Sequence, residues 1–268
     1  MNSTAAQDQL AKQLLAASNG DIGAATQSLQ RVARAQKQIK VVIPNTEIIV
    51  AVDQVSKSYK VGKTKVSALK SVSLNIHKGE FIAITGTSGS GKSTLLQLLG
   101  GLDKPTGGTI TINKQNLAKL RDGKLSQFRN KTIGFVFQFF YLQPFLSLQT
   151  NIAVPGMFAR TPHKLRTARS LQLAEQVGLG DRVKHLPREL SGGQMQRAAI
   201  ARALQNNPNI LLADEPTGNL DRTNALAIFK LFKDIRDKNG TTVIVVTHDV
   251  ELAEIADRTI HMSDGLVV

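Results

Sequence analysis

Val, Ile and Thr are concentrated in several short stretches of the chain. Turns that contain Gly, Asn or Lys separate these stretches. Such stretches predict β-strands, because β-branched side chains suit a pleated, half-buried surface. They lie at residues 47–59, 68–77, 80–85, 107–113 and 131–137. Two later stretches, 209–213 and 241–247, are short and apolar at their centres, which is typical of parallel strands covered on both faces.

Other stretches carry apolar residues at helical spacing. They predict helices at 92–100, 164–178 and 194–205, with further helical runs between the late apolar strands. Helices that alternate with buried strands indicate an α/β fold. Because the chain contains no internal repeat, we expect one unit of this kind.

The first 45 residues differ from the rest. They are rich in Ala and Gln, with apolar residues at helical spacing and a break at Asn19-Gly20. We therefore expect a helical or partly disordered N-terminal extension at 1–45, followed by a single domain at 46–268.

Composition narrows the class of protein. No run approaches the roughly 18 apolar residues of a membrane-spanning helix, and the N-terminus lacks the basic start and apolar core of a secretory signal. The absence of cysteine excludes disulfides and thiolate metal sites and fits a reducing cytosol. The net charge of +14 comes from scattered Lys and Arg without interleaved aromatics. This pattern favours a solvated basic surface or a membrane face, so no nucleic-acid partner is expected.

The stretch GTSGSGKST has the most specific pattern in the chain. It fits G-x-x-x-x-G-K-[ST], with a predicted strand before it and a predicted helix after it. Its glycines let backbone N–H groups turn toward phosphates, while Lys92 would reach the β- and γ-phosphates and Ser93 would hold Mg²⁺. The candidate phosphate-binding residues are Gly86, Thr87, Ser88, Gly89, Ser90, Gly91, Lys92, Ser93 and Thr94.

Two carboxylates end the apolar stretch ILLADEP. Asp214 is a second candidate ligand of Mg²⁺, since carboxylates in this position anchor the metal in P-loop enzymes. Glu215 lies one residue further along and is the candidate general base for an attacking water. Alone, the pair would indicate only a strand that ends in solvated acids, but the phosphate-binding loop favours the catalytic interpretation.

Three further polar residues lie where they could reach a nucleotide. Gln138 and His248 each follow a predicted strand of the same sheet, at the edge where α/β sheets bind ligands. Gln138 is a candidate to touch Mg²⁺ and the attacking water, and His248 is a candidate to orient Glu215. Tyr59 precedes the phosphate-binding loop, where its ring could stack on adenine or could be an ordinary half-buried strand residue.

A second anion-binding pattern lies far from the first. ELSGGQMQRAAIARAL places Ser191, Gly192 and Gly193 at the start of a predicted helix, where unpaired N–H groups and the positive end of the helix dipole favour a phosphate. One nucleotide-binding unit thus carries two phosphate-binding turns.

Together these segments resemble the ATP-binding subunits of ABC transporters, from about Glu47 to the C-terminus. LSGGQ at 190–194 looks like the signature motif of that family, and DEPTGNLD at 214–221 matches its neighbouring loops. The resemblance implies a P-loop NTPase core with a mixed, mainly parallel sheet. It also implies an N-terminal antiparallel β subdomain and a helical signature subdomain at about 139–209.

The resemblance further implies an ATPase that uses Mg²⁺ and dimerises head to tail on ATP. In such a homodimer Ser191, Gly192, Gly193 and Gln194 of one copy would contact the nucleotide held by the lysine loop of the other. The same resemblance implies an integral-membrane permease as partner and a cytoplasmic location on the inner face of the membrane.

A narrower resemblance concerns the branch that serves lipoprotein-release, macrolide-export and cell-division permeases. It rests on DEPTGNLD and on IGFVFQFFYLQP at 133–144. The sequence departs from this branch at Thr150-Asn151, where Glu-Asn is usual. Residues 138–157 would form the permease-docking surface, with Phe139, Phe140, Tyr141 and Phe145 either exposed there or packed in the helical subdomain.

Two other classes of function are weighed against this one. The first is a regulatory ATPase that gates a membrane partner without moving cargo, and the sequence leaves it open. The second is a DNA-repair or chromosome-organising ATPase, which would need coiled-coil or zinc-binding insertions between the two phosphate-binding turns. That interval holds neither heptads nor cysteine pairs.

Overall fold

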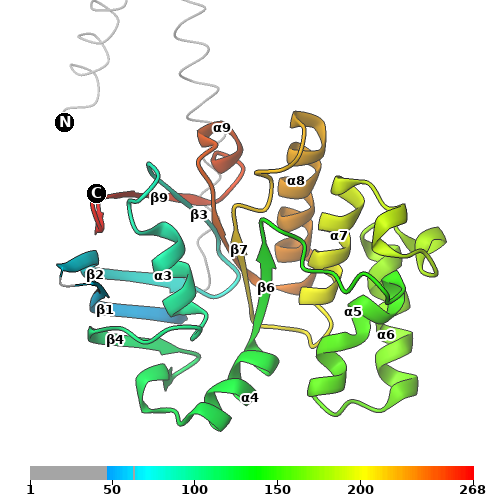
Figure 1. Cartoon of the computed structure of the whole chain (residues 1–268), viewed down its shortest axis with the longest axis horizontal. Helices are drawn as coiled ribbons and strands as arrows, with labels where there is room; N and C mark the ends of the chain where they lie inside the picture. The colour runs from blue at the N-terminus through cyan, green and yellow to red at the C-terminus, as the bar shows by residue number, and fades with distance from the viewer. Residues whose placement is uncertain (1–46, 63) are drawn as a thin grey trace, which may run out of the picture. The chain divides into compact units, whose positions relative to one another are not determined.

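The computed structural model describes residues 47–62 and 64–268 (Figure 1). The expected N-terminal extension lies outside the described residues. The boundaries given above for the extension, the main domain and the helical subdomain therefore stay predictions. Within the part of the chain that the structure describes, no helix is long and apolar enough to cross a membrane.

An antiparallel sheet opens the described chain, as the family resemblance implies. Its strand order is β2-β1-β4-β5, with β1 and β2 forming a long hairpin. The strands are β1 (Ile48–Val61), β2 (Thr64–His77), β4 (Gly107–Ile112) and β5 (Gln115–Asn116). Val50, Val52 and Val55 of β1 are buried, so one face of this sheet contributes to a core.

A second sheet has the order β10-β9-β3-β8-β7-β6, and all its pairs are parallel except β10 with β9. It comprises β3 (Phe81–Thr85), β6 (Ile133–Phe137), β7 (Ile210–Asp214), β8 (Thr242–Val246), β9 (Arg258–Ser263) and β10 (Leu266–Val267). Every residue of β3 and β8 is buried, which explains their unbroken apolar pattern. Since the parallel strands run the same way, their carboxyl ends meet at one edge.

Two hydrophobic cores lie on the two faces of the parallel sheet. Helix α3 (Lys92–Leu99) fills the space between the two sheets, where its leucines pack with Ile82 and Ile84 of β3 (Figure 1). On the opposite face Phe81 contacts Phe229 and Phe232 of α8 (Arg222–Asn239). Alternate residues of β3 therefore serve different cores, as the two-residue period of a strand requires.

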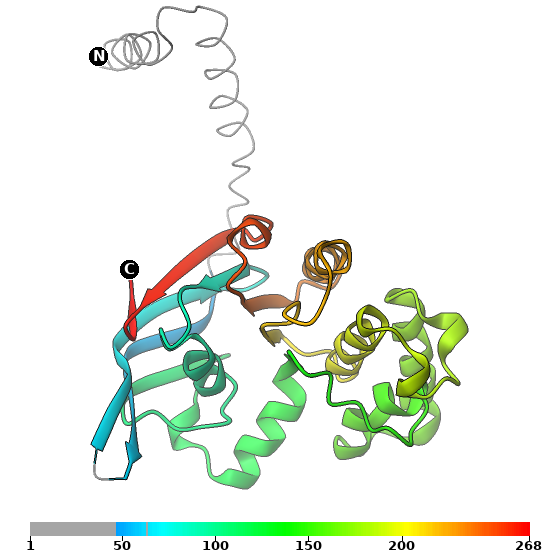
Figure 2. The ribbon, with the colours of Figure 1, turned by 45° about the horizontal axis from the view of Figure 1, so that its top comes forward.

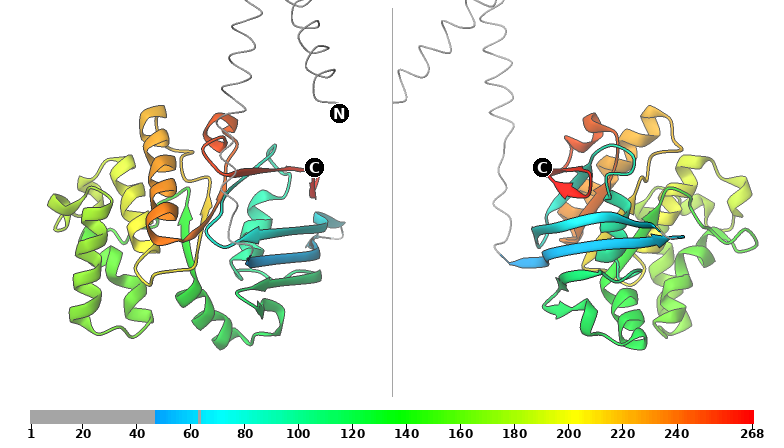
Figure 3. Two further views of the ribbon diagram at one scale, coloured as in Figure 1. Left: turned by 180° about the vertical axis from the view of Figure 1, so that it is seen from behind. Right: turned by 60° about the vertical axis from the view of Figure 1, so that its left-hand side comes forward.

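The helices α5, α6 and α7 pack on one another beside the parallel sheet, and Figures 2 and 3 show them on the side opposite the antiparallel strands. The remaining helices are α4, which precedes β6, and the short α9. Their bounds are α4 (Asp122–Thr132), α5 (Leu148–Phe158), α6 (His163–Gln176), α7 (Gly192–Ala203) and α9 (Val250–Ala253).

The structure confirms the predicted α/β class and most predicted elements, and it adds helices α4 and α5 and strands β5, β9 and β10. The apolar pattern does not indicate α4 or α5. Helix α5 contains Pro155, a residue that normally ends a helix, and its start depends on Ser147, whose hydroxyl accepts a hydrogen bond from Thr150 N at 3.3 Å. Helix α7 begins at Gly192, two residues earlier than predicted, because Ser191 caps it.

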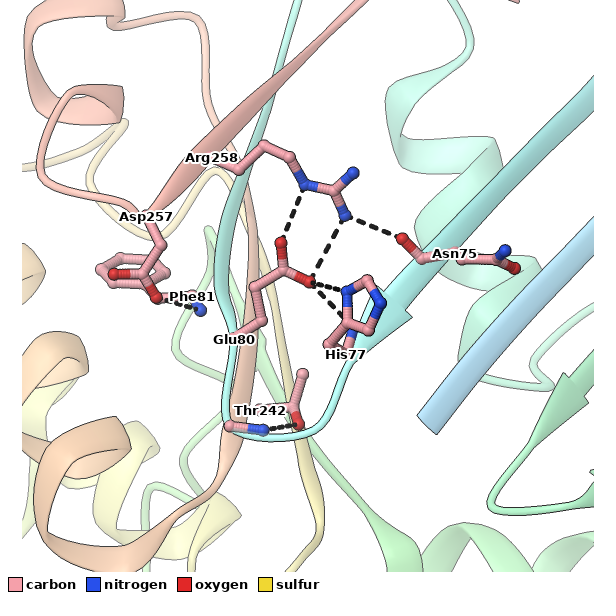
Figure 4. A network of polar contacts seen from close by, with 8 residues as sticks. Asn75, His77, Glu80, Phe81, Thr242, Asp257 and Arg258 are labelled. Carbon is pink, nitrogen blue, oxygen red and sulfur yellow. Dashed lines mark hydrogen bonds and ion pairs between the residues drawn. The ribbon is translucent and has the colours of Figure 1, made fainter. Parts of the chain in front are cut away.

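A buried carboxylate joins the two sheets at the end opposite the edge where the carboxyl ends of the parallel strands meet (Figure 4). Glu80 is only 5% exposed and receives hydrogen bonds from Arg258 Nε at 2.8 Å and from His77 N at 2.8 Å. The same guanidinium donates to Asn75 O of β2 at 2.7 Å. Arg258 opens β9, so this network fixes the hairpin strand β2 against β9 and sets the start of β3, which leads into the phosphate-binding loop.

We expect Glu80→Ala to lower the free energy of unfolding by about 2–3 kcal/mol, because it removes the acceptor for both partners and leaves the Arg258 charge without its carboxylate. Denaturant unfolding monitored by circular dichroism measures this loss. Glu254→Ala, which removes an exposed carboxylate of the same type, is the control and should change stability little. Equal losses in the two variants would contradict the structural role of the network.

Candidate functional site

The phosphate-binding loop connects β3 to α3 and requires glycine at its turning points. Gly86 has φ 145° and Gly91 has φ 100°, in the left-handed region that side chains disfavour. A Cβ at Gly86 would collide with the carbonyl oxygen of Met262, and one at Gly91 would lie 2.6 Å from Ala68 O. The loop is therefore closely held between β2 and β9.

Lys92 lies inside this loop and not on the surface. Its side chain is buried, and Nζ donates to Gly86 O at 2.9 Å and to Thr87 O at 2.8 Å. A cavity of about 400 Å³ opens beside it. The residues lining this cavity are Ala68, Ser88, Gly89, Gly91, Lys92, Ser93, Thr94, Glu215 and His248. The structure thus brings together much of the predicted loop and two of the three candidate catalytic residues.

Asp214 ends β7 next to the first residues of α3. Ser93 Oγ donates to Asp214 Oδ1 at 2.9 Å, so the two predicted magnesium ligands are in direct contact. Burial raises the pKa of the Asp214 carboxyl, and the neighbouring Glu215 charge acts in the same direction, while the Ser93 hydrogen bond and the Lys92 charge oppose them. A nearby cation would stabilise the ionised form of a buried carboxylate in this position.

Glu215 and His248 form a pair at the same edge. His248 Nδ1 lies 2.6 Å from Glu215 Oε2, and both side chains line the cavity. Glu215 has φ 46°, an uncommon conformation for a residue with a side chain. Its N–H donates to Val246 O at 3.0 Å and its carbonyl accepts from Gly218 N at 3.1 Å, and these bonds hold the unusual turn that aims the carboxylate.

Gln138 lies at the end of β6 but does not line the cavity in the described part of the chain. Its amide packs against Gly218, where an added Cβ would lie 2.8 Å from Gln138 Nε2. The backbone carbonyl of Gln138 accepts a hydrogen bond from Asn219 Nδ2 at 3.3 Å. The side chain therefore contacts the GNLD segment, and its expected contact with Mg²⁺ stays a prediction.

Tyr59 lies on β1 and is half-buried. It is not one of the described residues that line the cavity beside Lys92. Its hydroxyl donates to Asp103 Oδ2 at 3.0 Å, and Lys57 Nζ lies 4.9 Å from the centre of its ring. The two interpretations of this tyrosine, adenine platform or strand residue, both fit a half-buried ring.

The turn predicted to bind a second phosphate lies at the start of a helix, as its sequence predicts. Ser191 caps α7, accepting from Gln194 N at 3.3 Å, while Gln194 Oε1 accepts from Ser191 N at 2.9 Å. Ser191 is exposed, whereas Gly193 is buried against Asn224. Within the described residues, none of these groups lines the cavity beside Lys92.

Two side chains of α7 hold the segment around Gln138, and the sequence reasoning did not identify them. Gln196 is fully buried and donates through Nε2 to Phe137 O at 3.4 Å. Arg202 donates to Phe140 O at 2.8 Å and also to Tyr141 O. Burial lowers the pKa of the Arg202 guanidinium. The only signal in the sequence is that both polar residues interrupt the mostly apolar face of a helix.

Comparison with known proteins identifies this arrangement. The sequence model described as "ABC transporter" matches residues 69–218. The chain belongs to the ABC transporter family. Among its relatives, the ABC transporter ATP-binding protein YvrO of Bacillus subtilis is 47% identical over 82% of this chain and 96% of its own length. The lipoprotein-releasing system ATP-binding protein LolD of Shewanella denitrificans is 44% identical over 84% and 96%.

Solved structures of ABC transporter cassettes agree with the fold. The ATP-binding cassette MJ0796, in a dimeric post-hydrolysis state bound to ADP and Pi, has 44% identity and a TM-score of 0.75. The match covers 81% of this chain and 96% of that one. CbiO1 of Clostridium perfringens, part of the ABC transporter complex cbiONQ, has 29% identity and a TM-score of 0.75, covering 83% and 87%.

These comparisons confirm the main prediction from the sequence. The chain is an ATP-binding and ATP-hydrolysing subunit of an ABC transporter, which drives a separate membrane permease. The relatives named LolD also confirm the resemblance to the lipoprotein-release branch. The roles of individual site residues stay predictions.

We expect Lys92→Ala to weaken ATP binding at least about tenfold, because a buried ammonium group makes charge-assisted hydrogen bonds to phosphate. Isothermal titration calorimetry measures the change. Lys230→Ala, which removes an exposed lysine of α8, is the matched control and should bind ATP normally. Retained affinity in Lys92→Ala would contradict the assignment of this lysine.

Proposed function

We propose that two copies of this chain close head to tail on two ATP molecules, each nucleotide lying between one copy's Lys92 loop and the other copy's Ser191–Gln194 turn. The observation that carries this proposal is the separation of the two turns in one chain. Both turns contain glycine and lead into a helix, a pattern that favours an anion, yet among the described residues the signature residues lie outside the cavity beside Lys92. A second copy can supply the missing turn.

The electrostatics of the chain favour a nucleotide-dependent dimer. The chain carries a net charge of +14, so two copies repel one another in the absence of bound anions. A triphosphate at each shared site opposes that repulsion and binds the closed state preferentially. Hydrolysis weakens this attraction, which makes the dimer a switch between open and closed states.

Mg²⁺ fits the group formed by Ser93 and Asp214. These two oxygen donors touch at 2.9 Å, and burial of the carboxylate favours a cation beside it. Mg²⁺ commonly takes only one or two protein ligands and completes its shell with water and phosphate oxygens. Gln138 would join this shell by turning away from Gly218. When bound, the metal would neutralise charge that develops on the phosphates.

Glu215 and His248 are the groups that act on the attacking water. In this proposal Glu215 accepts the proton from water, and His248 orients the carboxylate by donating from Nδ1 across the 2.6 Å contact. To donate to the γ-phosphate through Nε2 as well, the ring must be in the imidazolium form, which carries a proton on both nitrogens. The ring of His248 is 68% exposed, so a second copy could cover it and exclude solvent. Tyr59 supplies the face on which adenine stacks.

A groove between the parallel sheet and the helical layer fits the permease. It has a volume of about 510 Å³, lies between α4, β6, α5 and α7, and is lined by Leu102, Tyr141, Pro155 and Phe158 among others. Tyr141 and Phe158 are strongly exposed. We infer that a cytoplasmic segment of the permease docks here and holds the subunit at the membrane face. Motion of α7 would reach this groove through Arg202, which is part of its lining.

The relatives named for lipoprotein release support a permease of that class as the partner. We infer that the partner belongs to this class and acts on lipid-anchored proteins, with the ATPase supplying the mechanical step. Thr150 replaces the expected Glu in the first turn of α5, where its hydroxyl lies 2.9 Å from Ser147 Oγ, and it is not among the residues that line the groove.

We expect Glu215→Gln to bind ATP but to lower turnover about a hundredfold or more, because the general base is lost while the binding groups remain. With MgATP the variant should accumulate as a dimer in sedimentation velocity. The double variant Glu215→Gln with Ser191→Arg is the matched control and should stay monomeric. A monomer at all concentrations of Glu215→Gln with MgATP would contradict the shared nucleotide.

We expect Tyr141→Asp and Phe158→Asp to abolish co-purification of the permease from membranes, since each places a charge in the apolar groove. Leu165→Asp is the matched control, because Leu165 is an exposed apolar residue of α6 that does not line the groove. Mass spectrometry of the captured membrane protein identifies the partner. Undiminished capture by both groove variants would show that the permease docks elsewhere.

A further inference from the structure

Tyr59 is held by a carboxylate that the proposed mechanism does not use. Asp103 follows the helix of the phosphate-binding loop, and its two oxygens have separate partners. Oδ2 accepts from the Tyr59 hydroxyl at 3.0 Å. Oδ1 accepts from Lys57 Nζ at 2.6 Å and from Lys104 N at 2.7 Å. The carboxylate therefore joins a strand of the antiparallel sheet to the end of the α3 segment.

Lys57 completes this cluster. Its side chain is only 12% exposed, and Nζ also donates to Lys104 O at 2.8 Å. Because Nζ lies 4.9 Å from the centre of the Tyr59 ring, it occupies one face of that ring. A base that stacks on Tyr59 must therefore use the opposite face. The orientation of the ring is fixed at both its hydroxyl end and one of its faces.

The segment that carries Asp103 is itself fixed to β1. Thr106 N donates to Ser56 O at 2.8 Å, and Ser58 N donates to Thr106 Oγ1 at 2.9 Å. At its other end Leu102 N donates to Gln97 O at 2.9 Å. Asp103 is thus a rigid support whose position depends on α3, and α3 begins at the residues that bind phosphate.

We propose that Asp103 is a positioning residue for the nucleotide base, which orients the Tyr59 ring relative to the phosphate-binding loop so that adenine finds a preformed stacking face. This inference rests on the proposed role of Tyr59. It adds that the distance from phosphate to base is set through α3 and Asp103, and that Lys57 blocks the opposite face.

The ionisation of the cluster agrees with this arrangement. The pKa of Tyr59 is raised by burial first and by its contact with Asp103 second, with an opposing contribution from the Thr94 hydroxyl. Burial by itself would raise the pKa of Asp103, but the hydrogen bonds from Lys57, Lys104 N and Tyr59 together outweigh it and lower the pKa. Tyr59 therefore stays a hydrogen-bond donor and Asp103 a charged acceptor at neutral pH.

Paired binding measurements test the proposal. ATP and inorganic tripolyphosphate, which has no base, are titrated by calorimetry into the full chain and its variants. We expect Asp103→Asn to weaken ATP binding about threefold and to leave tripolyphosphate binding unchanged, since only the stacking of the base is affected. Asp122→Asn removes an exposed, ion-paired carboxylate nearby and should change neither affinity. Equal weakening of both ligands by Asp103→Asn would overturn the proposal, because it would indicate general damage to the loop.

A double-mutant cycle tests whether Asp103 acts through the tyrosine hydroxyl. Tyr59→Phe keeps the ring and should weaken ATP about threefold by itself, and Tyr59→Phe with Asp103→Asn should be no weaker. A multiplied effect of about ninefold would overturn the proposal, because it would show that the two residues act independently. If Asp103→Asn does not fold, as judged by its thermal transition, Tyr59→Phe still tests the hydroxyl with the two ligands. In that case equal binding of ATP by Tyr59→Phe and the parent chain would overturn the proposal.

Tyrosine fluorescence separates this inference from the proposed function. The chain has two tyrosines and no tryptophan, so Tyr59 is the only fluorophore in a Tyr141→Phe background. We expect Asp103→Asn to change the emission of Tyr59, and MgATP to quench it. A changed emission without quenching by MgATP would show that the contact exists but that Tyr59 does not stack on the base, which overturns the adenine assignment. If MgATP quenches Tyr59 but Asp103→Asn changes neither the emission nor the affinity for ATP, the adenine assignment is kept. That result would overturn the role of Asp103.

Discussion

The parallel pairing of β3, β8, β7 and β6 is the constraint on which the site depends. Because these strands run in one direction, each delivers the residues that follow it to the same edge of the sheet. The phosphate-binding loop follows β3, the two carboxylates follow β7, and His248 follows β8. The direction and pairing of the strands thus collect residues far apart in the sequence at one cavity.

Side-chain contacts then set the finer geometry at that edge. The left-handed turn at Glu215 is held by two backbone bonds, and the carboxylate it aims is oriented by His248. Lys92 is fixed within its own loop by two carbonyl groups. Groups that are already in place need little rearrangement when the reaction occurs. Most of the effect of electrostatic catalysis comes from such preorganisation.

Polar contacts also connect the site to parts of the protein that do no chemistry. Gln196 and Arg202 hold the segment around Gln138 to the helix that begins at the signature turn. Asp103 joins the opening strand to the end of the helix that begins at Lys92. Each contact pairs a buried or half-buried charged or amide group with a backbone, hydroxyl or ammonium partner. Such directional contacts fix the relative position of the two segments more tightly than an apolar contact would.

The sequence by itself determined the class of fold, the order of most strands and helices, and the candidate residues of the site, whose individual roles stay predictions. It could do so because G-x-x-x-x-G-K-S needs only a strand before it and a helix after it, and because the apolar strands end in Asp214, Glu215 and His248. Helix α5 was not predicted, because Pro155 interrupts the usual helical pattern and because the helix begins at a Ser147 cap that apolar periodicity does not indicate. Only the tertiary structure decided that Gln138 packs against Gly218, that Arg202 holds the loop behind it, and that Asp103 supports Tyr59. These are contacts between side chains distant in the chain, and no local pattern specifies them, because they depend on how whole elements pack.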